Sequence, residues 1–124
     1  MTDKVAFIKG ASRGIGAESA VALARAGYRV AITARTLADG ECHDHVGNAS
    51  VLPGSLAATA AAVARAGSEA LCLRGDILDP SSLVAAAEAA LSRFGRIDLL
   101  FNNAVYQGAG NLEPLLQVSE DQLR

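Results

Sequence analysis

The residues best suited to chemistry lie in a glycine-rich segment, GASRGIG, at residues 10–16. An apolar run at 5–8 precedes it, and apolar residues at 17, 20, 21 and 24 follow it with helical spacing. Glycine lets the backbone turn sharply and approach a bulky ligand without a Cβ atom in the way. A strand, a glycine turn and a helix N-terminus in this order direct N–H groups and a positive dipole at a phosphate. The segment predicts a dinucleotide site, with an ordinary glycine turn as the alternative.

The spacing of these glycines, G-x-x-x-G-x-G, differs from that of two general phosphate loops. The fingerprint G-x-G-x-x-G/A fails because Ser19 stands three residues after Gly16. The loop G-x-x-x-x-G-K-[ST] fails because no Gly-Lys pair follows Gly10 at the required distance. The pattern resembles the T-G-x-x-x-G-x-G loop of the short-chain dehydrogenase/reductase family.

Three further segments resemble the same family in the same order along the chain. Apolar runs at 30–33, 70–73 and 97–101 predict strands, and they are followed by Arg35, by Gly75-Asp76-Ile77 and by Asn102-Asn103-Ala104. In the family, an aspartate after the third strand contacts the adenine ring. An N-N-A-G segment after the fourth strand supports the sheet and flanks the cofactor. The resemblance covers essentially the whole chain apart from residues 36–53.

The alternation of strands and helical segments predicts the fold class, α/β with a Rossmann-type doubly wound parallel sheet. Right-handed crossovers place the four strands in the order 3-2-1-4, which is part of such a sheet. Helices are expected at 54–66 and at 80–94, the second with Asp79 as N-cap and Gly95 as terminator. The buried stripe of that second helix is expected to consist of Val84, Ala87, Leu91 and Phe94.

Residues 36–53 are expected to form a long solvated loop. They include CHDH at 42–45, four potential metal ligands in a row. Adjacent residues in an extended loop point in different directions, so no metal site is predicted. Cys72 is expected in a buried strand and Cys42 in the loop, so no disulfide framework is predicted.

The resemblance implies a role for each matched position. Backbone N–H groups of the glycine segment would face the ribose and pyrophosphate, Asp76 would accept from the adenine amino group, and Ile77 would pack on the ring. Asp76 has a simpler alternative as a turn aspartate. Asn103 and Ala104 would line the ribose on the nicotinamide side. The predicted cofactor-binding residues are Gly10, Ser12, Arg13, Gly14, Ile15, Gly16, Arg35, Asp76, Ile77, Asn103 and Ala104.

The end of the second predicted strand bears on the choice between NAD(H) and NADP(H). Family members that prefer NAD(H) place an acid there, which accepts from the ribose 2′-hydroxyl and repels a 2′-phosphate. Here the position is Ala34, followed by Arg35, and Arg13 supplies a second guanidinium in the glycine segment. These residues favour NADP over NAD, with an ordinary surface charge as the alternative for Arg35.

The catalytic pattern of the family is not found in this sequence. Members transfer a hydride between nicotinamide and a carbonyl or alcohol with Ser, Tyr and Lys, the last two in a Y-x-x-x-K motif. The tyrosines here are Tyr28 and Tyr106 and the lysines Lys4 and Lys9, so no such motif and no catalytic residue is predicted. Residues 1–124 are therefore expected to be the N-terminal dinucleotide-binding part of a single domain, inactive without its catalytic half.

Two other interpretations stay open, a non-catalytic dinucleotide-binding module and a degenerate remnant. An epimerase or dehydratase on a related nucleotide fold fits the glycine spacing less well. Lys9 and Val105 depart from the family's pattern, where Thr or Ser precedes the first glycine and Gly closes N-N-A-G. Both departures bear on cofactor affinity rather than on the fold.

Composition and charge exclude several classes of partner. The net charge of −2 offers no polycationic surface for nucleic acid or anionic lipid. No apolar stretch approaches the roughly 20 residues that span a bilayer, and Asp3 argues against a signal peptide. The two unpaired cysteines favour a cytoplasmic location. The family resemblance implies a small-molecule carbonyl or alcohol substrate for the complete enzyme, and it leaves a homo-oligomer open.

Overall fold

The computed structural model describes residues 4–35, 42–45, 48–51 and 55–104, with backbone only at 42–45 and 48–51. Its main sheet has four strands, β1 (Val5–Lys9), β2 (Arg29–Ala34), β5 (Ala70–Arg74) and β6 (Leu99–Asn102). The helices are α1 (Gly14–Arg25), α2 (Leu56–Arg65) and α3 (Pro80–Phe94). Two further strands, β3 (Cys42–His45) and β4 (Asn48–Val51), pair with each other.

All strand pairs of the main sheet are parallel, in the order β5-β2-β1-β6. Counted as the first to fourth predicted strands, this is the order 3-2-1-4, so the predicted topology is confirmed. Phe7 of β1 is in register with Ala31 of β2 on one side and with Leu100 of β6 on the other. Because the strands are parallel, their carboxyl ends meet at one edge, where ligands bind in such sheets.

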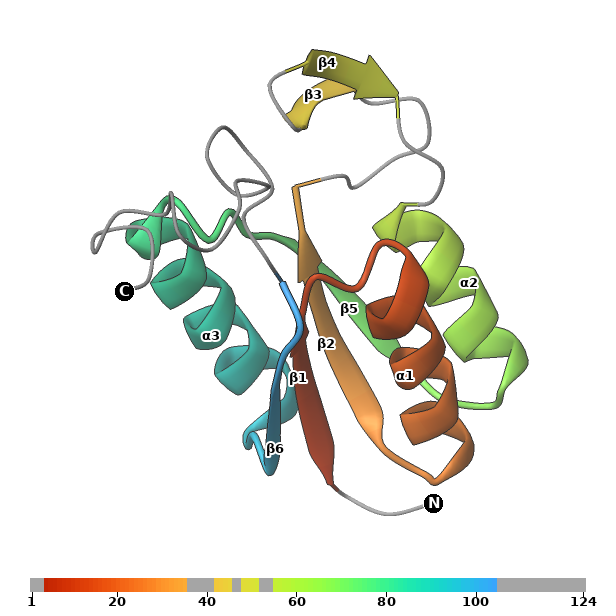
Figure 1. Cartoon of the computed structure of the whole chain (residues 1–124). Coiled ribbons are helices and arrows are strands. Elements are labelled where there is room, and N and C mark those ends of the chain that lie inside the picture. The colour runs from red at the N-terminus through yellow and green to blue at the C-terminus, as the bar shows by residue number, and fades with distance from the viewer. Residues whose placement is uncertain (1–3, 36–41, 46–47, 52–54, 105–124) are drawn as a thin grey trace, which may run out of the picture.

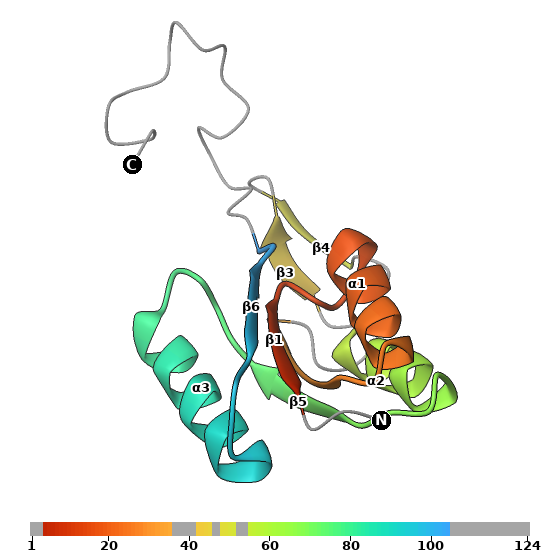
Figure 2. The same ribbon diagram turned by 90° about the horizontal axis from the view of Figure 1, so that it is seen from below.

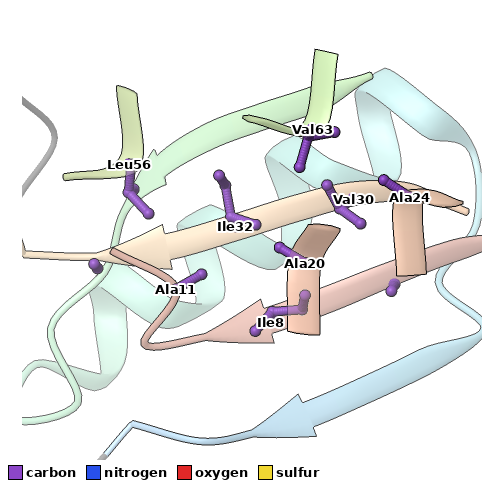
Figure 3. Close-up of a cluster of buried hydrophobic side chains, with 10 residues drawn as sticks. Ile8, Ala11, Ala20, Ala24, Val30, Ile32, Leu56 and Val63 are labelled. Carbon is purple, nitrogen blue, oxygen red and sulfur yellow. The ribbon is translucent and has the colours of Figure 1, made fainter. Parts of the chain in front are cut away.

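Helices cover both faces of the sheet, with α1 and α2 on one face and α3 on the other (Figures 1 and 2). Residues of β1 alternate between the two cores, as the pleat of a strand requires. Ile8 faces a cluster that includes Ala20 of α1 and Leu56 of α2 (Figure 3), whereas Phe7 faces a cluster that includes Phe94 of α3. The fold is therefore doubly wound over the described residues.

Two of the helices, α2 and α3, begin at residues whose side chains cap the helix N-terminus. The Ser55 hydroxyl accepts from the amide of Ala58 at the start of α2, at 3.1 Å. The Asp79 carboxylate accepts from the amide of Ser81 at 3.2 Å, and Pro80 is the first residue of α3. Gly95 ends α3 in the left-handed region, with φ of 82°. The predicted signals of α3 are thus confirmed.

The buried face of α3 differs from the prediction. Ala86, Ala90 and Phe94 are buried, whereas Val84 and Leu91 are 58% and 47% exposed. An alanine-rich helix carries more than one apolar stripe, and here α3 presents alanines that allow a close approach to β1 and β5. Of the predicted stripe, Phe94 is buried and Ala87 packs beside the core.

Two other expectations were wrong. The predicted loop at 36–53 contains β3 and β4, which pair in antiparallel fashion with Cys42 opposite Val51. Cys72 is exposed rather than buried, because β5 is one of the two outer strands of the described sheet. The side chains of Cys42–His45, and with them the metal question, lie outside the described residues. Within the described part of the chain, no helix is long and apolar enough to cross a membrane.

Candidate cofactor-binding site

The glycine turn after β1 is bonded to the neighbouring strand. The amides of Gly10 and Ala11 both donate to the carbonyl of Thr33, at 2.9 and 3.0 Å. Gly10 adopts φ of 81°, and a Cβ atom there would lie 2.8 Å from the Cα atom of Ala104. The turn therefore requires glycine at its first position both for its conformation and for its approach to the end of β6.

The other two glycines of the segment serve different purposes. A Cβ atom on Gly16 would lie 2.0 Å from the Gly10 carbonyl oxygen, so α1 packs directly on the turn. Gly14 has φ of 60° and nothing within 4 Å of a Cβ atom, so it supplies conformation rather than space. The helix can consequently begin within a few residues of the strand.

The end of β6 is joined to this turn through Asn103 and Ala104. The side-chain amide of Asn103 donates to the Gly10 carbonyl at 3.1 Å. Ala104 lies against Gly10, as described above. The structure therefore brings two predicted site segments, 93 residues apart in sequence, to the same edge of the sheet.

The N-terminus of α1 differs from those of α2 and α3 in the described chain. Its N-cap, Arg13, makes no side-chain capping bond, whereas Ser55 and Asp79 cap the other two helices. The first N–H groups of an α-helix have no partner within the helix. Ile15 in this first turn has a side chain that is 71% exposed, while Ser12 just before it is buried. These N–H groups, with the dipole behind them, can bind an anion such as a pyrophosphate.

A buried threonine on α2, which the sequence analysis did not single out, also contacts the turn. The Thr59 hydroxyl donates to the Ala11 carbonyl at 2.7 Å and lies 3.2 Å from the Ser55 carbonyl. Thr59 is 4% exposed. Its isolated position among alanines in the segment LAATAAAVAR was the available signal.

Arginines gather where β2 and β5 end. Arg35 directly follows β2, and burial together with the positive charge of Arg35 lowers the pKa of Arg13. Arg74, the last residue of β5, donates from Nη1 to the carbonyl of Arg35. The two predicted arginines are therefore close enough to interact, and a third, missed by sequence reasoning, reaches the same place.

Asp76 and Ile77 lie in the turn between β5 and α3. Asp76 Oδ1 accepts from the amide of Leu78 at 2.9 Å, and the Asp76 amide donates to the Ser82 hydroxyl at 3.0 Å. Asp76 is thus a turn aspartate, and this turn leaves Oδ2 to accept from another donor. Ile77 is half-buried beside it. Of the family departures, Lys9 ends β1, and Val105 lies outside the described residues.

The parallel sheet and the glycine turn define a dinucleotide-binding α/β domain. A family model described as enoyl-(acyl carrier protein) reductase matches residues 10–124. The chain belongs to the short-chain dehydrogenase/reductase family, as the glycine spacing predicted.

Individual relatives agree with this assignment. The hydroxysteroid dehydrogenase-like protein 2 of Xenopus tropicalis is 42% identical over 98 residues, which are 79% of this chain and 21% of that protein. Carveol dehydrogenase from Mycobacterium avium, in complex with NAD, has a TM-score of 0.73 and 28% identity over 96% of this chain and 41% of that chain. A metagenomic short-chain oxidoreductase in complex with NADP has a TM-score of 0.69 and 32% identity over 98% and 47%. The chain thus spans a fifth to a half of these relatives.

Proposed function

We propose that this chain binds NADP(H) and is the cofactor-binding part of an oxidoreductase that transfers a hydride between nicotinamide and a carbonyl or alcohol. The observation that carries the proposal is the uncapped N-terminus of α1, which follows a glycine turn and lies near two arginines. Solved relatives bound to NAD and to NADP support a nicotinamide dinucleotide in general. The arginines support NADP(H) in particular.

Each group in the proposed site has a distinct task. The first-turn amides of α1 would bind the pyrophosphate, and the exposed Ile15 side chain would be covered by the cofactor. Asp76 would hold the adenine amino group through Oδ2. Arg13 and Arg35 would bind the 2′-phosphate, whose negative charge would offset the repulsion between the two guanidinium groups. When bound, the nicotinamide supplies the hydride chemistry.

We further propose that the 124-residue polypeptide does not turn over substrate by itself. Hydride transfer to a carbonyl requires a proton donor held at the substrate oxygen, and no Y-x-x-x-K motif is found in the sequence. General acid–base help alone contributes about 10²–10⁴-fold to the rate. A panel of carbonyl and alcohol substrates, followed by NADPH absorbance, should give no turnover. Rates on the order of 1–10³ s⁻¹, ordinary for enzymes, would contradict this proposal.

Calorimetric titration with NADP⁺ and NAD⁺ tests the cofactor assignment. We expect tighter binding of NADP⁺, and Arg35→Ala should remove most of the difference. Losing a charge-assisted bond costs roughly 1.5–3 kcal/mol, or about 10- to 150-fold in Kd. Arg25→Ala, in the last turn of α1, is the matched control. Equal affinity of the unmodified chain for both cofactors would overturn the preference for NADP(H). If the chain bound neither cofactor, the proposed dinucleotide site itself would be refuted.

A further inference from the structure

We propose that Arg74 is a positioning residue that sets cofactor preference by holding the backbone from which Arg35 projects. This inference rests on the proposed NADP(H) site and assigns a role to a residue outside the family's glycine and aspartate motifs. Arg74 is the last residue of β5, and Asp76 lies in the turn that follows this strand.

The register of the sheet brings Arg74 to Arg35. Ala34, the last residue of β2, is opposite Arg74, the last residue of β5. The amide of Gly75 donates to the Ala34 carbonyl at 3.0 Å, which closes the pair of strands at their carboxyl ends. The Arg74 guanidinium then donates from Nη1 to the carbonyl of Arg35, one residue further. The carbonyls of two successive residues, Ala34 at the end of β2 and Arg35 after it, are therefore bonded to Gly75 and Arg74 at the end of β5.

The charges at this edge explain why Arg35 needs to be held. Arg13 and Arg35 are both cationic and close enough to interact, so each favours a separation of the two side chains. Movement of the backbone after β2 would carry Arg35 away from Arg13. The Arg74 bond limits that movement at the backbone. It thereby keeps both guanidinium groups near the place where a 2′-phosphate would be shared between them.

A purely structural role for Arg74 makes a different prediction. If the bond only stabilised the pairing of β2 with β5, its loss would weaken the binding of NADP⁺ and the binding of NAD⁺ to the same extent. NAD⁺ has no 2′-phosphate and gains nothing from the position of Arg35. The ratio of the two dissociation constants therefore reports positioning, whereas their common change reports stability.

The test is calorimetric binding of NADP⁺ and NAD⁺ to Arg74→Gln and Arg74→Lys. For Arg74→Gln we expect the Kd of NADP⁺ to rise about 2- to 10-fold, the effect of one net hydrogen bond, with less than about a 2-fold change for NAD⁺. Arg74→Lys keeps the charge and should fall between Arg74→Gln and the unmodified chain. Arg65→Gln, an exposed arginine in the last turn of α2, is the control. Thermal unfolding checks that each variant is folded.

A double-mutant cycle with Arg35→Ala distinguishes positioning from a direct contact. If Arg74 acts through Arg35, Arg74→Gln should have no further effect on NADP⁺ binding once Arg35 is alanine. Additive effects would overturn the positioning role, as would an unchanged NADP⁺ to NAD⁺ ratio in both Arg74 variants. An unmodified chain without any preference for NADP⁺ would instead refute the proposed site, and this inference with it.

Discussion

The Asn103 side chain donates to the carbonyl of Gly10, with 3.1 Å between Nδ2 and the oxygen. This bond connects the end of β6 to the turn that follows β1. The same turn is held from β2 by the Thr33 carbonyl and from α2 by the Thr59 hydroxyl. The glycines of the proposed phosphate site permit its backbone conformation. Hydrogen bonds from three elements remote in sequence then fix that conformation.

Replacement of Asn103 by alanine should weaken both the fold and cofactor binding. The variant loses a net hydrogen bond of about 0.5–1.5 kcal/mol and frees the turn at Gly10. Urea unfolding and calorimetric titration with NADP⁺ measure the two effects. Asn102→Ala, at an exposed neighbouring position, is the control and should leave binding unchanged. Unaltered NADP⁺ affinity in Asn103→Ala would show that the bond does not shape the site.

Alanine at Gly16 should be far more damaging than alanine at Gly14. At Gly16 the new Cβ atom would lie 2.0 Å from the Gly10 carbonyl oxygen, so the turn and α1 must separate. At Gly14 the space is open, and the cost is the positive φ of 60°, about 1–2 kcal/mol. Thermal unfolding and NADP⁺ titration of both variants test this order. Equal losses would mean that the turn and α1 accommodate a Cβ atom at position 16, and that close packing does not select glycine there.

Loss of the Thr59 hydroxyl should destabilise the chain more than loss of its methyl group. Thr59→Val keeps the shape of the side chain but leaves the buried Ala11 carbonyl without this donor, at a cost of about 1–3 kcal/mol. Thr59→Ser retains the donor and should restore most of the stability. Chemical denaturation ranks the variants. A serine variant no more stable than the valine one would assign the effect to packing instead.

Local chemistry made much of this structure predictable. The cap at Asp79, the terminator at Gly95 and the turn at Gly10 each depend on residues within a few positions. The handedness of crossovers then set the strand order. The bonds that complete the site were not predictable in this way, because Thr59 and Arg74 reach residues 48 and 39 positions away. Their partners depend on the register between strands and on which face α2 turns toward the sheet. A sequence motif carries no information on either.

The choice between two apolar faces of α3 shows the same limit. Val84 and Leu91 are more hydrophobic than Ala86 and Ala90, and both pairs have helical spacing. Hydrophobicity therefore favoured the wrong pair, since close approach of the helix to the sheet requires small side chains. The exposed Cys72 has a similar origin, because a sequence pattern does not distinguish an outer strand from a central one.

Acid should remove the contribution of Asp98 to stability. Its carboxylate accepts from the Arg96 guanidinium and from the Val5 amide at 2.8 Å, and these bonds, the Arg96 bond first, lower its pKa below the ordinary 3.8. A lowered pKa in the folded state adds stability above the ordinary value, and that stability is lost as the pH falls through the folded value. Asp98→Asn should therefore have a lower free energy of unfolding than the unmodified chain at pH 7, and this difference should disappear as the pH falls below about 3.8. Urea unfolding at several pH values measures the difference. A difference that does not change with pH would contradict the assignment.

The 124-residue polypeptide should self-associate through β6. Within the described sheet β6 is an edge strand, Leu100 is 58% exposed, and an apolar groove of about 510 Å³ lies between it and α1. An edge strand with open N–H and C=O groups and exposed leucine favours pairing with a second copy, which charges oppose. Leu100→Lys should therefore shift the chain toward monomer in size-exclusion chromatography with light scattering. Val84→Lys, which places the same charge on an equally exposed site of α3, should leave the association intact. A sharp monomer peak for the unmodified chain, or dissociation by both variants alike, would rule out β6 as the interface.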